Sequence, residues 1–165
     1  METTFSPDVI SNNEIVLRLS LAVVAGLILG LDRELRGISA GIRTHALVSL
    51  SSAVITLSAL MLYAEIRQLE GDSDPDPLRA IQGLAQAIGF IGAGTIFFAR
   101  GDVHNLTSAA NIWMAAAVGI VAGSGQLSLG AVAVAFTVVI VTVVRVIEAV
   151  LPRTNKSRDH NAGQD

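Results

Sequence analysis

The stretch AIQGLAQAIGFIGAGTIFFA, residues 80–99, decides the fold class of this chain. It is predominantly apolar and about 20 residues long, which is the length of helix that crosses a hydrocarbon core of about 30 Å. Small residues recur along it, and Ala85, Gly89 and Ala93 lie four apart on one helical face. Small-residue faces allow membrane helices to approach closely. We therefore predict a central membrane helix here, against which the other helices pack.

The composition of the whole chain favours the same class. Hydrophobic residues make up 52% of the sequence and charged residues only 15%, whereas soluble domains carry about 25% charged residues. The chain has no cysteine, which excludes a disulfide framework and a thiolate metal site. It contains no P-loop, no HExxH pattern and no nucleophile elbow. We predict a membrane protein that is not an enzyme and has no catalytic residue. Its expected partner is the lipid bilayer, and we expect no nucleic-acid binding.

Five apolar segments are separated by short polar connections. They cover residues 15–31, 44–63, 80–99, 106–122 and 127–151. The predicted fold is an all-α polytopic membrane protein, a compact bundle of about five transmembrane helices. Its predicted organisation is an extracytoplasmic segment at residues 1–14, a transmembrane domain at 15–151 and a disordered cytoplasmic tail at 152–165.

The distribution of charge predicts the orientation of the bundle. Basic residues follow the first, third and fifth segments, at Arg33, Arg36, Arg43, Arg100, Arg153, Lys156 and Arg158. Acidic residues dominate the connection at residues 65–77 on the opposite side. Because cytoplasmic loops are enriched in Lys and Arg, we predict an outside N-terminus and a cytoplasmic C-terminus in the bacterial inner membrane.

The second segment carries a polar stripe. His45, Ser49, Ser52 and Thr56 are spaced by four, three and four residues, which places them on one helical face. One interpretation is a polar lining that leads inward from the cytoplasmic side. The other is structural, because Ser and Thr in membrane helices hydrogen-bond to neighbouring helices or to their own backbone.

Glycines repeat in three of the five segments and predict close helix packing without a wide pore. The candidate packing glycines are Gly26, Gly30, Gly89, Gly92, Gly94, Gly119 and Gly123. In the fourth segment two of them continue a stripe that begins at Asn111 and passes through Ala115.

Charged and polar residues gather at the predicted cytoplasmic ends of the first, second and fourth segments. This candidate inner-face cluster consists of Asp32, Arg33, Glu34, Arg43, Thr44, His45, Thr107 and Asn111. Asp32 and Glu34 are candidate ligands of a hydrated Mg²⁺, since magnesium prefers oxygen ligands; no other cofactor is expected. The alternative is a structural ion-pair cluster of these carboxylates with Arg33, Arg36 or Arg43. Arg145 and Glu148, three apart, predict a local ion pair.

Several of these stretches resemble the motifs of one family of bacterial membrane proteins. GLDRE at residues 30–34 and AGIRTHALV at 40–48 resemble the first signature of the MgtC/SapB family. GFIGAGTI at 89–96 resembles its central glycine motif, and LTSAANIW at 106–113 and GIVAG at 119–123 resemble its third motif and the continuation of that motif. The matches follow in order over residues 17–150. Asn105 stands where the family usually has glycine.

The resemblance implies an inner-membrane protein linked to magnesium homeostasis and stress adaptation. Two hypotheses follow for its action. The first is non-enzymatic modulation by helix–helix contact with membrane partners, among which the resemblance suggests the ATP synthase, or with further copies of the chain as a homo-oligomer. The second is a small carrier or channel for Mg²⁺ or another cation.

Overall fold

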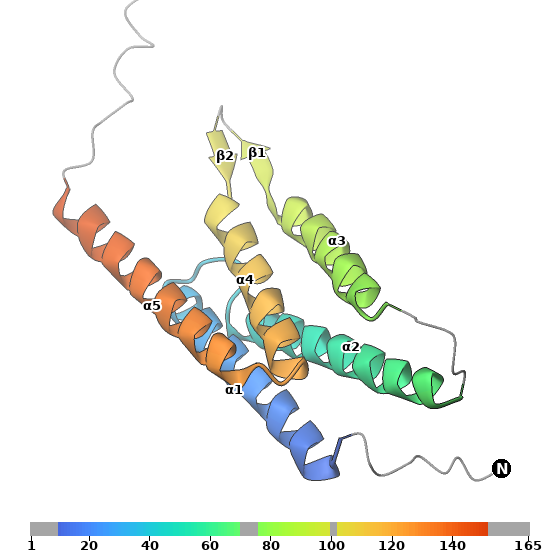
Figure 1. Cartoon of the computed structure of the whole chain (residues 1–165). Coiled ribbons are helices and arrows are strands. Elements are labelled where there is room, and N and C mark those ends of the chain that lie inside the picture. The colour runs from blue at the N-terminus through green and yellow to red at the C-terminus, as the bar shows by residue number, and fades with distance from the viewer. Residues whose placement is uncertain (1–9, 70–75, 100–101, 152–165) are drawn as a thin grey trace, which may run out of the picture.

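The computed structural model describes residues 10–69, 76–99 and 102–151. Within these ranges the chain forms five helices and one two-stranded antiparallel hairpin (Figure 1). In order, they are α1 (Asn12–Leu35), α2 (Ile42–Leu69), α3 (Leu78–Thr95), β1 (Phe97–Ala99), β2 (Asp102–His104), α4 (Leu106–Gly123) and α5 (Leu127–Val150). The predicted all-α class with five helices is confirmed, although α3 ends at Thr95 and the hairpin replaces the end of the predicted third helix. The predicted tail at residues 152–165, and most of the predicted N-terminal segment, lie outside the described residues.

The sequence explains how two of the helices begin. Ser11 caps α1, because its side-chain oxygen accepts a hydrogen bond from the Glu14 N–H at 3.3 Å. The α4 helix is entered through Asn105, which has a left-handed backbone with φ of 68°. Asn adopts this conformation more readily than most residues other than Gly. Asn105 can therefore make a turn at which the resembled family usually has glycine.

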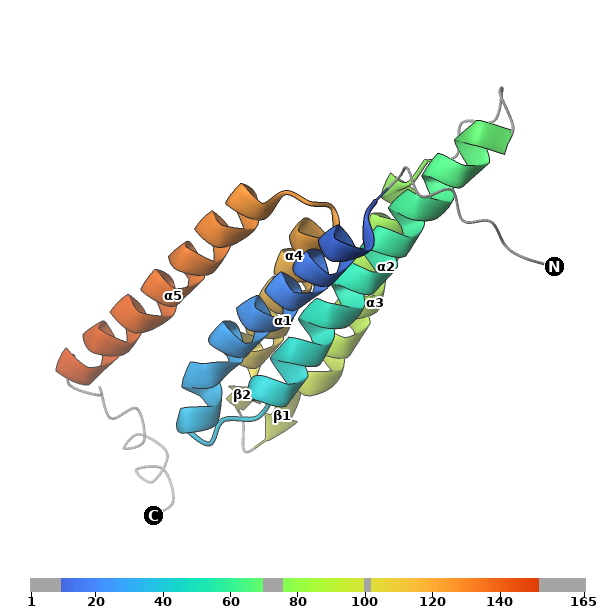
Figure 2. The ribbon, with the colours of Figure 1, turned by 90° about the horizontal axis from the view of Figure 1, so that it is seen from below.

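Successive helices run in opposite directions, so that their connections gather at two ends of the bundle (Figure 2). The α1–α2 connection, the hairpin and the C-terminal end of α5 share one end, which we call the loop end. The α4–α5 turn lies at the opposite end beside the beginning of α1, where the Arg18 side chain donates to the Gly123 carbonyl oxygen at 2.9 Å. The described basic residues Arg33, Arg36 and Arg43 therefore belong to the same end as the end of α5.

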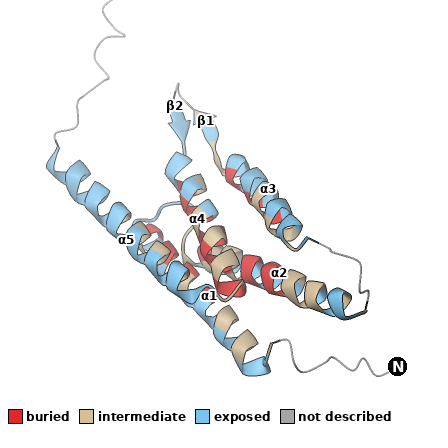
Figure 3. Cartoon of the chain, in the orientation of Figure 1, coloured by how far each residue is buried: buried red, intermediate tan, exposed pale blue. Residues whose placement is uncertain are grey.

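The tightly packed core is made by α1, α2 and α4, and α4 contacts all four other helices. Buried residues concentrate where these three helices meet, as Figure 3 shows. The prediction that residues 80–99 form the central helix is wrong. The α3 helix lies at the edge of the bundle and buries only Leu84, Ile88 and Gly92 among its residues, all of which the structure describes. Its apolar side chains, not its small-residue face, meet the core.

Within the described part of the chain, four helices are long and apolar enough to cross a membrane: α1, α2, α4 and α5. The α5 helix, described along its full length, contains no buried residue. Its large apolar side chains, such as Phe136 and Ile140, are exposed, which is the arrangement expected of a helix that faces lipid. These features are those of a multi-pass membrane protein.

Candidate functional site

Four glycines allow α1 and α4 to pack closely against the backbone of α2. They are Gly26 and Gly30 of α1 and Gly119 and Gly123 of α4, and we call them the glycine seam. A Cβ at Gly26 would lie 2.6 Å from the His45 carbonyl oxygen, and one at Gly123 would lie 2.5 Å from that of Ala53. A Cβ at Gly119 would overlap the Ser49 carbonyl oxygen. Real Cβ atoms do not come so close to backbone, so these positions admit only hydrogen.

The glycines predicted in α3 behave differently. A Cβ at Gly89 or Gly94 would meet nothing within 4 Å in the described part of the chain, and one at Gly92 would be 3.8 Å from the Ala109 Cβ. Gly89 and Gly94 are exposed. The structure therefore does not use Ala85, Gly89 and Ala93 as a packing face.

The polar face of α2, defined by His45, Ser49, Ser52 and Thr56, is buried inside the core. Ser49 donates from its hydroxyl to the Ala22 carbonyl oxygen at 2.7 Å and so joins α2 to α1. The His45 Nδ1 lies 2.9 Å from the Gly41 carbonyl oxygen, to which it donates as the Nδ1–H tautomer. Within the described residues, His45 Nε2, Ser52 Oγ and Thr56 Oγ1 have no hydrogen-bond partner. The face thus combines interhelical bonding with unpaired polar atoms.

Arg33 joins α1 to the start of α4 at the loop end. It is only 4% exposed, and its guanidinium donates to the Ser108 hydroxyl and, at 3.3 Å, to the Ser39 carbonyl oxygen. Asn105 continues this junction, because its amide donates to the Thr95 carbonyl at 3.1 Å and accepts from the Ser39 hydroxyl at 3.2 Å. The side-chain Nε of Arg33 has no partner among the described residues.

Asp32 pairs with Arg36, one of the three arginines expected, and also with Arg145, which was not expected. Its carboxylate lies 2.9 Å from Arg36 and 3.4 Å from Arg145 of α5, whereas Arg43 is exposed on α2. Arg145 therefore reaches across to α1, and the structure shows no ion pair between the described Arg145 and Glu148 side chains. The reason is the approach of the C-terminal half of α5 to the end of α1, which the spacing within α5 cannot reveal.

Glu34 caps the beginning of α2. Its carboxylate accepts the backbone N–H of Ile42, the first residue of α2, at 3.1 Å. A carboxylate at a helix N-terminus satisfies a free N–H and interacts favourably with the helix dipole. Gly41 permits this contact, since a Cβ there would overlap the Glu34 carboxylate.

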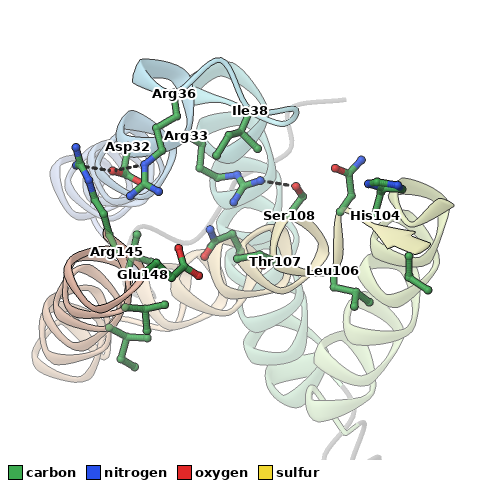
Figure 4. A pocket seen from close by; sticks show the side chains of 16 residues that line it. Asp32, Arg33, Arg36, Ile38, His104, Leu106, Thr107, Ser108, Arg145 and Glu148 are labelled. Carbon is green, nitrogen blue, oxygen red and sulfur yellow. Dashed lines mark hydrogen bonds and ion pairs between the residues drawn. The ribbon is translucent and has the colours of Figure 1, made fainter. Parts of the chain in front are cut away.

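A cavity of about 550 Å³ opens between α1, α4 and α5 at the loop end, and we call it the Asp32 cavity. Figure 4 shows Asp32 between Arg36 and Arg145, with Arg33 directed toward Ser108 and away from them. Thr107, Asn111 and Glu148 line the same cavity. Glu34, Arg43, Thr44 and His45 do not line it. The structure therefore divides the predicted inner-face cluster.

The two candidate magnesium ligands do not converge. Asp32 is directed into the arginine pairs and Glu34 to the start of α2. Among the described residues, no group of three or more His, Cys, Asp or Glu side chains has a geometry suited to a metal ion. The residues with side-chain oxygens that line the Asp32 cavity are Asp32, Asn105, Thr107, Ser108, Asn111 and Glu148.

The sequence did not reveal the roles of Ser39 and Ser108 at this end. It also did not reveal that Arg145 pairs with a residue of α1. Ser108 lies three residues before Asn111, so the i,i+3 spacing on a helix face could have identified it. Ser39 and Arg145 act through contacts across elements, for which the sequence gives no signal.

Comparison with known proteins places this sequence in a family. The sequence model of the MgtC family matches residues 19–150. The Escherichia coli (strain K12) protein named "Putative magnesium transporter YhiD" is 38% identical over 117 residues, which cover 71% of this chain and 54% of that protein. Protein SrpB of Synechococcus elongatus is 38% identical over 132 residues, or 73% of this chain and 69% of SrpB.

Protein MgtC of Brucella abortus (strain 2308) is 34% identical over 133 residues, covering 81% of this chain and 52% of MgtC. The chain thus spans about half the length of several curated relatives that it matches. No solved structure matches it. The match of the family model over most of the chain, together with these relatives, shows that the chain belongs to the MgtC family.

Proposed function

We propose that this protein acts in the bacterial inner membrane, in magnesium homeostasis and stress adaptation, without enzymatic chemistry and by helix contacts with other membrane proteins. The link to magnesium rests on family membership and on the name of a relative. The whole-protein activity of the longer relatives is extended to this chain as part of the proposal.

The observation that carries the proposal is the contrast between the closely packed helices α1, α2 and α4 and the exposed apolar side chains of α3 and α5. The glycine seam brings α1 and α4 into backbone contact with α2 around its polar face. In contrast, α3 and α5 expose large apolar side chains such as Phe90 and Phe136. Exposed apolar helix faces are suited to contact with other membrane helices, of which a membrane ATP synthase is one candidate from family resemblance and a second copy of the chain another.

The proposed orientation has the N-terminus outside and the loop end in the cytoplasm. Arg36 and Arg43 at that end support it through the preference of Lys and Arg for cytoplasmic loops. A green fluorescent protein fused after Asp165 is expected to fold and fluoresce, and alkaline phosphatase fused there is expected to be inactive. Active phosphatase at that position would contradict this orientation.

The second candidate function is a carrier or channel for Mg²⁺ or another cation. It draws on the Asp32 cavity, in which carboxylate, hydroxyl and amide oxygens share a space of about 550 Å³ with three arginines. A cation there would have to displace Arg36 and Arg145 from Asp32. Magnesium retains several waters and needs only one or two protein carboxylates, so a loose oxygen-lined cavity is compatible with a hydrated ion.

Flux measurements separate the two functions. The purified protein is reconstituted in liposomes that contain a magnesium-sensitive dye, and an Mg²⁺ gradient is applied with and without a membrane potential. The regulatory proposal predicts the same dye response as in empty liposomes. A protein-dependent flux that is lost in Asp32→Asn and kept in Glu34→Gln would instead establish transport and contradict a purely regulatory role.

A further inference from the structure

The space between α5 and the rest of the bundle is a groove with two different ends. Three cavities follow α5, with volumes of about 500 Å³, 220 Å³ and 550 Å³. Neighbouring cavities share lining residues: Ile28 lines the first and second, and Asp32, Asn111 and Val141 line the second and third. The three cavities therefore adjoin one another along α5, and we call this row of cavities the groove.

The character of the lining changes along this groove. The 500 Å³ cavity, which lies nearer the α4–α5 turn, is lined only by apolar residues, including Leu21, Val24 and Val134. The 550 Å³ Asp32 cavity at the loop end contains three arginines and two carboxylates, which give a formal charge of +1 when His104 is neutral. The groove is thus apolar near the α4–α5 turn and cationic at the loop end.

Arg33 adds a buried donor to the cationic end. It lines the Asp32 cavity, is 4% exposed, and has an Nε with no partner in the described part of the chain. A buried guanidinium requires an anion or several acceptors. Arg33 donates to two neutral acceptors, the Ser108 hydroxyl and the Ser39 carbonyl. It has no carboxylate partner among the described residues, so its charge is available to an incoming anion.

The part of the groove formed by the second and third cavities matches one leaflet. From Thr137 in the second cavity to Glu148 in the third, α5 rises about 16 Å at about 1.5 Å per residue, close to half of a hydrocarbon core of about 30 Å. We propose that this groove holds one phospholipid with an anionic headgroup, taken from the leaflet at the loop end. Its phosphate lies in the Asp32 cavity, whose walls carry Arg33, Arg36 and Arg145, and its acyl chains lie between α1 and α5.

Native mass spectrometry of the full chain in mild detergent tests this proposal, with dioleoyl phosphatidylglycerol and dioleoyl phosphatidylcholine offered at equal concentration. We expect one phosphatidylglycerol to be retained under conditions that remove phosphatidylcholine. Inorganic phosphate at millimolar concentration should not displace it. Equal retention of the two lipids, or displacement by phosphate, would overturn the proposal.

Charge variants test the headgroup site. Arg145→Gln is expected to lower phosphatidylglycerol affinity about fivefold, because one basic residue at a membrane surface contributes about 1 kcal/mol. Asp32→Asn should raise it by a similar factor, since it frees two arginines. Arg43→Gln is the matched control, because Arg43 carries the same charge at the same end but does not line the cavity. Equal effects of Arg43→Gln and Arg145→Gln would refute a defined site.

Filling the groove tests where the acyl chains lie. Val141→Trp places bulk where the second and third cavities meet, whereas Val139→Trp adds the same bulk at an exposed position of α5 that lines none of the three. Only Val141→Trp should release the lipid, with circular dichroism showing that both variants remain helical. A lipid-free dimer that Val141→Trp converts to a monomer would overturn the proposal and assign the groove to a second copy.

Discussion

The α4 and α3 helices are both 18 residues long and rich in small residues, yet they have opposite roles. Gly119 and Gly123 bring α4 against the backbone of α2, whereas Gly89 and Gly94 of α3 have open space beside them. The difference is the partner, because a small residue creates a packing seam only where another backbone occupies the space it leaves. Small-residue spacing therefore identifies candidates for a seam, and tertiary structure selects among them.

The largest expected difference in stability is between two variants that each add one methyl group, one in α4 and one in α3. Gly119→Ala should destabilise the protein by about 3 kcal/mol, because the new Cβ meets the Ser49 backbone, which cannot rotate away. Gly89→Ala adds the same atom beside open space and should be neutral or stabilising by up to about 1 kcal/mol through helix propensity. Thermal unfolding of both variants in the same detergent measures the difference. Equal losses would show that α3 is packed as tightly as α4.

A smaller effect is expected within the polar face of α2. Ser49→Ala removes the hydrogen bond to the Ala22 carbonyl and should cost about 1 kcal/mol, within the range measured for interhelical bonds in membranes. Ser52→Ala removes a buried hydroxyl that has no partner among the described residues, so its cost should be near zero. The two variants have the same volume change on the same helix. If Ser52→Ala proves the more costly, the assigned bonding of this face is incorrect.

The smallest effect concerns the contact between α1 and α5. A double-mutant cycle of Asp32→Asn and Arg145→Gln should give a coupling of about 0.2–1 kcal/mol, since Arg145 is 61% exposed and the ions are 3.4 Å apart. The corresponding cycle with Arg43→Gln should give no coupling. A coupling between Asp32 and Arg43 that exceeds the one with Arg145 would contradict the ion pair between α1 and α5.

Much of the fold follows from the sequence because the bilayer imposes simple rules. Apolar length located the helices, since a span needs about 20 apolar residues. The regular spacing of His45, Ser49, Ser52 and Thr56 correctly placed them on one face. The loop end gathers Arg33, Arg36 and Arg43 as the expected five-helix bundle requires.

The parts that the sequence did not reveal depend on contacts between distant segments. The pairing of Asp32 with Arg145 joins residues 113 positions apart, and helical spacing carries no information about it. The sequence also did not reveal that α3 lies at the edge of the bundle. Its small residues have the same spacing as those of a helix that does pack against another backbone. The hairpin was missed because Phe97, Phe98 and Ala99 extend an apolar run without a helical face to distinguish them.

Amide hydrogen exchange along the chain tests the division between core and outer helices most directly, because slow exchange reports the local free energy of opening. The measurement compares peptides from the middle of α2 and α4 with peptides from the middle of α3, all in the same detergent. We expect exchange to be slowest in α2 and α4, where the glycine seam holds three helices together, and clearly faster in α3. Exchange in α3 as slow as in α4, or slower, would contradict a core formed by α1, α2 and α4.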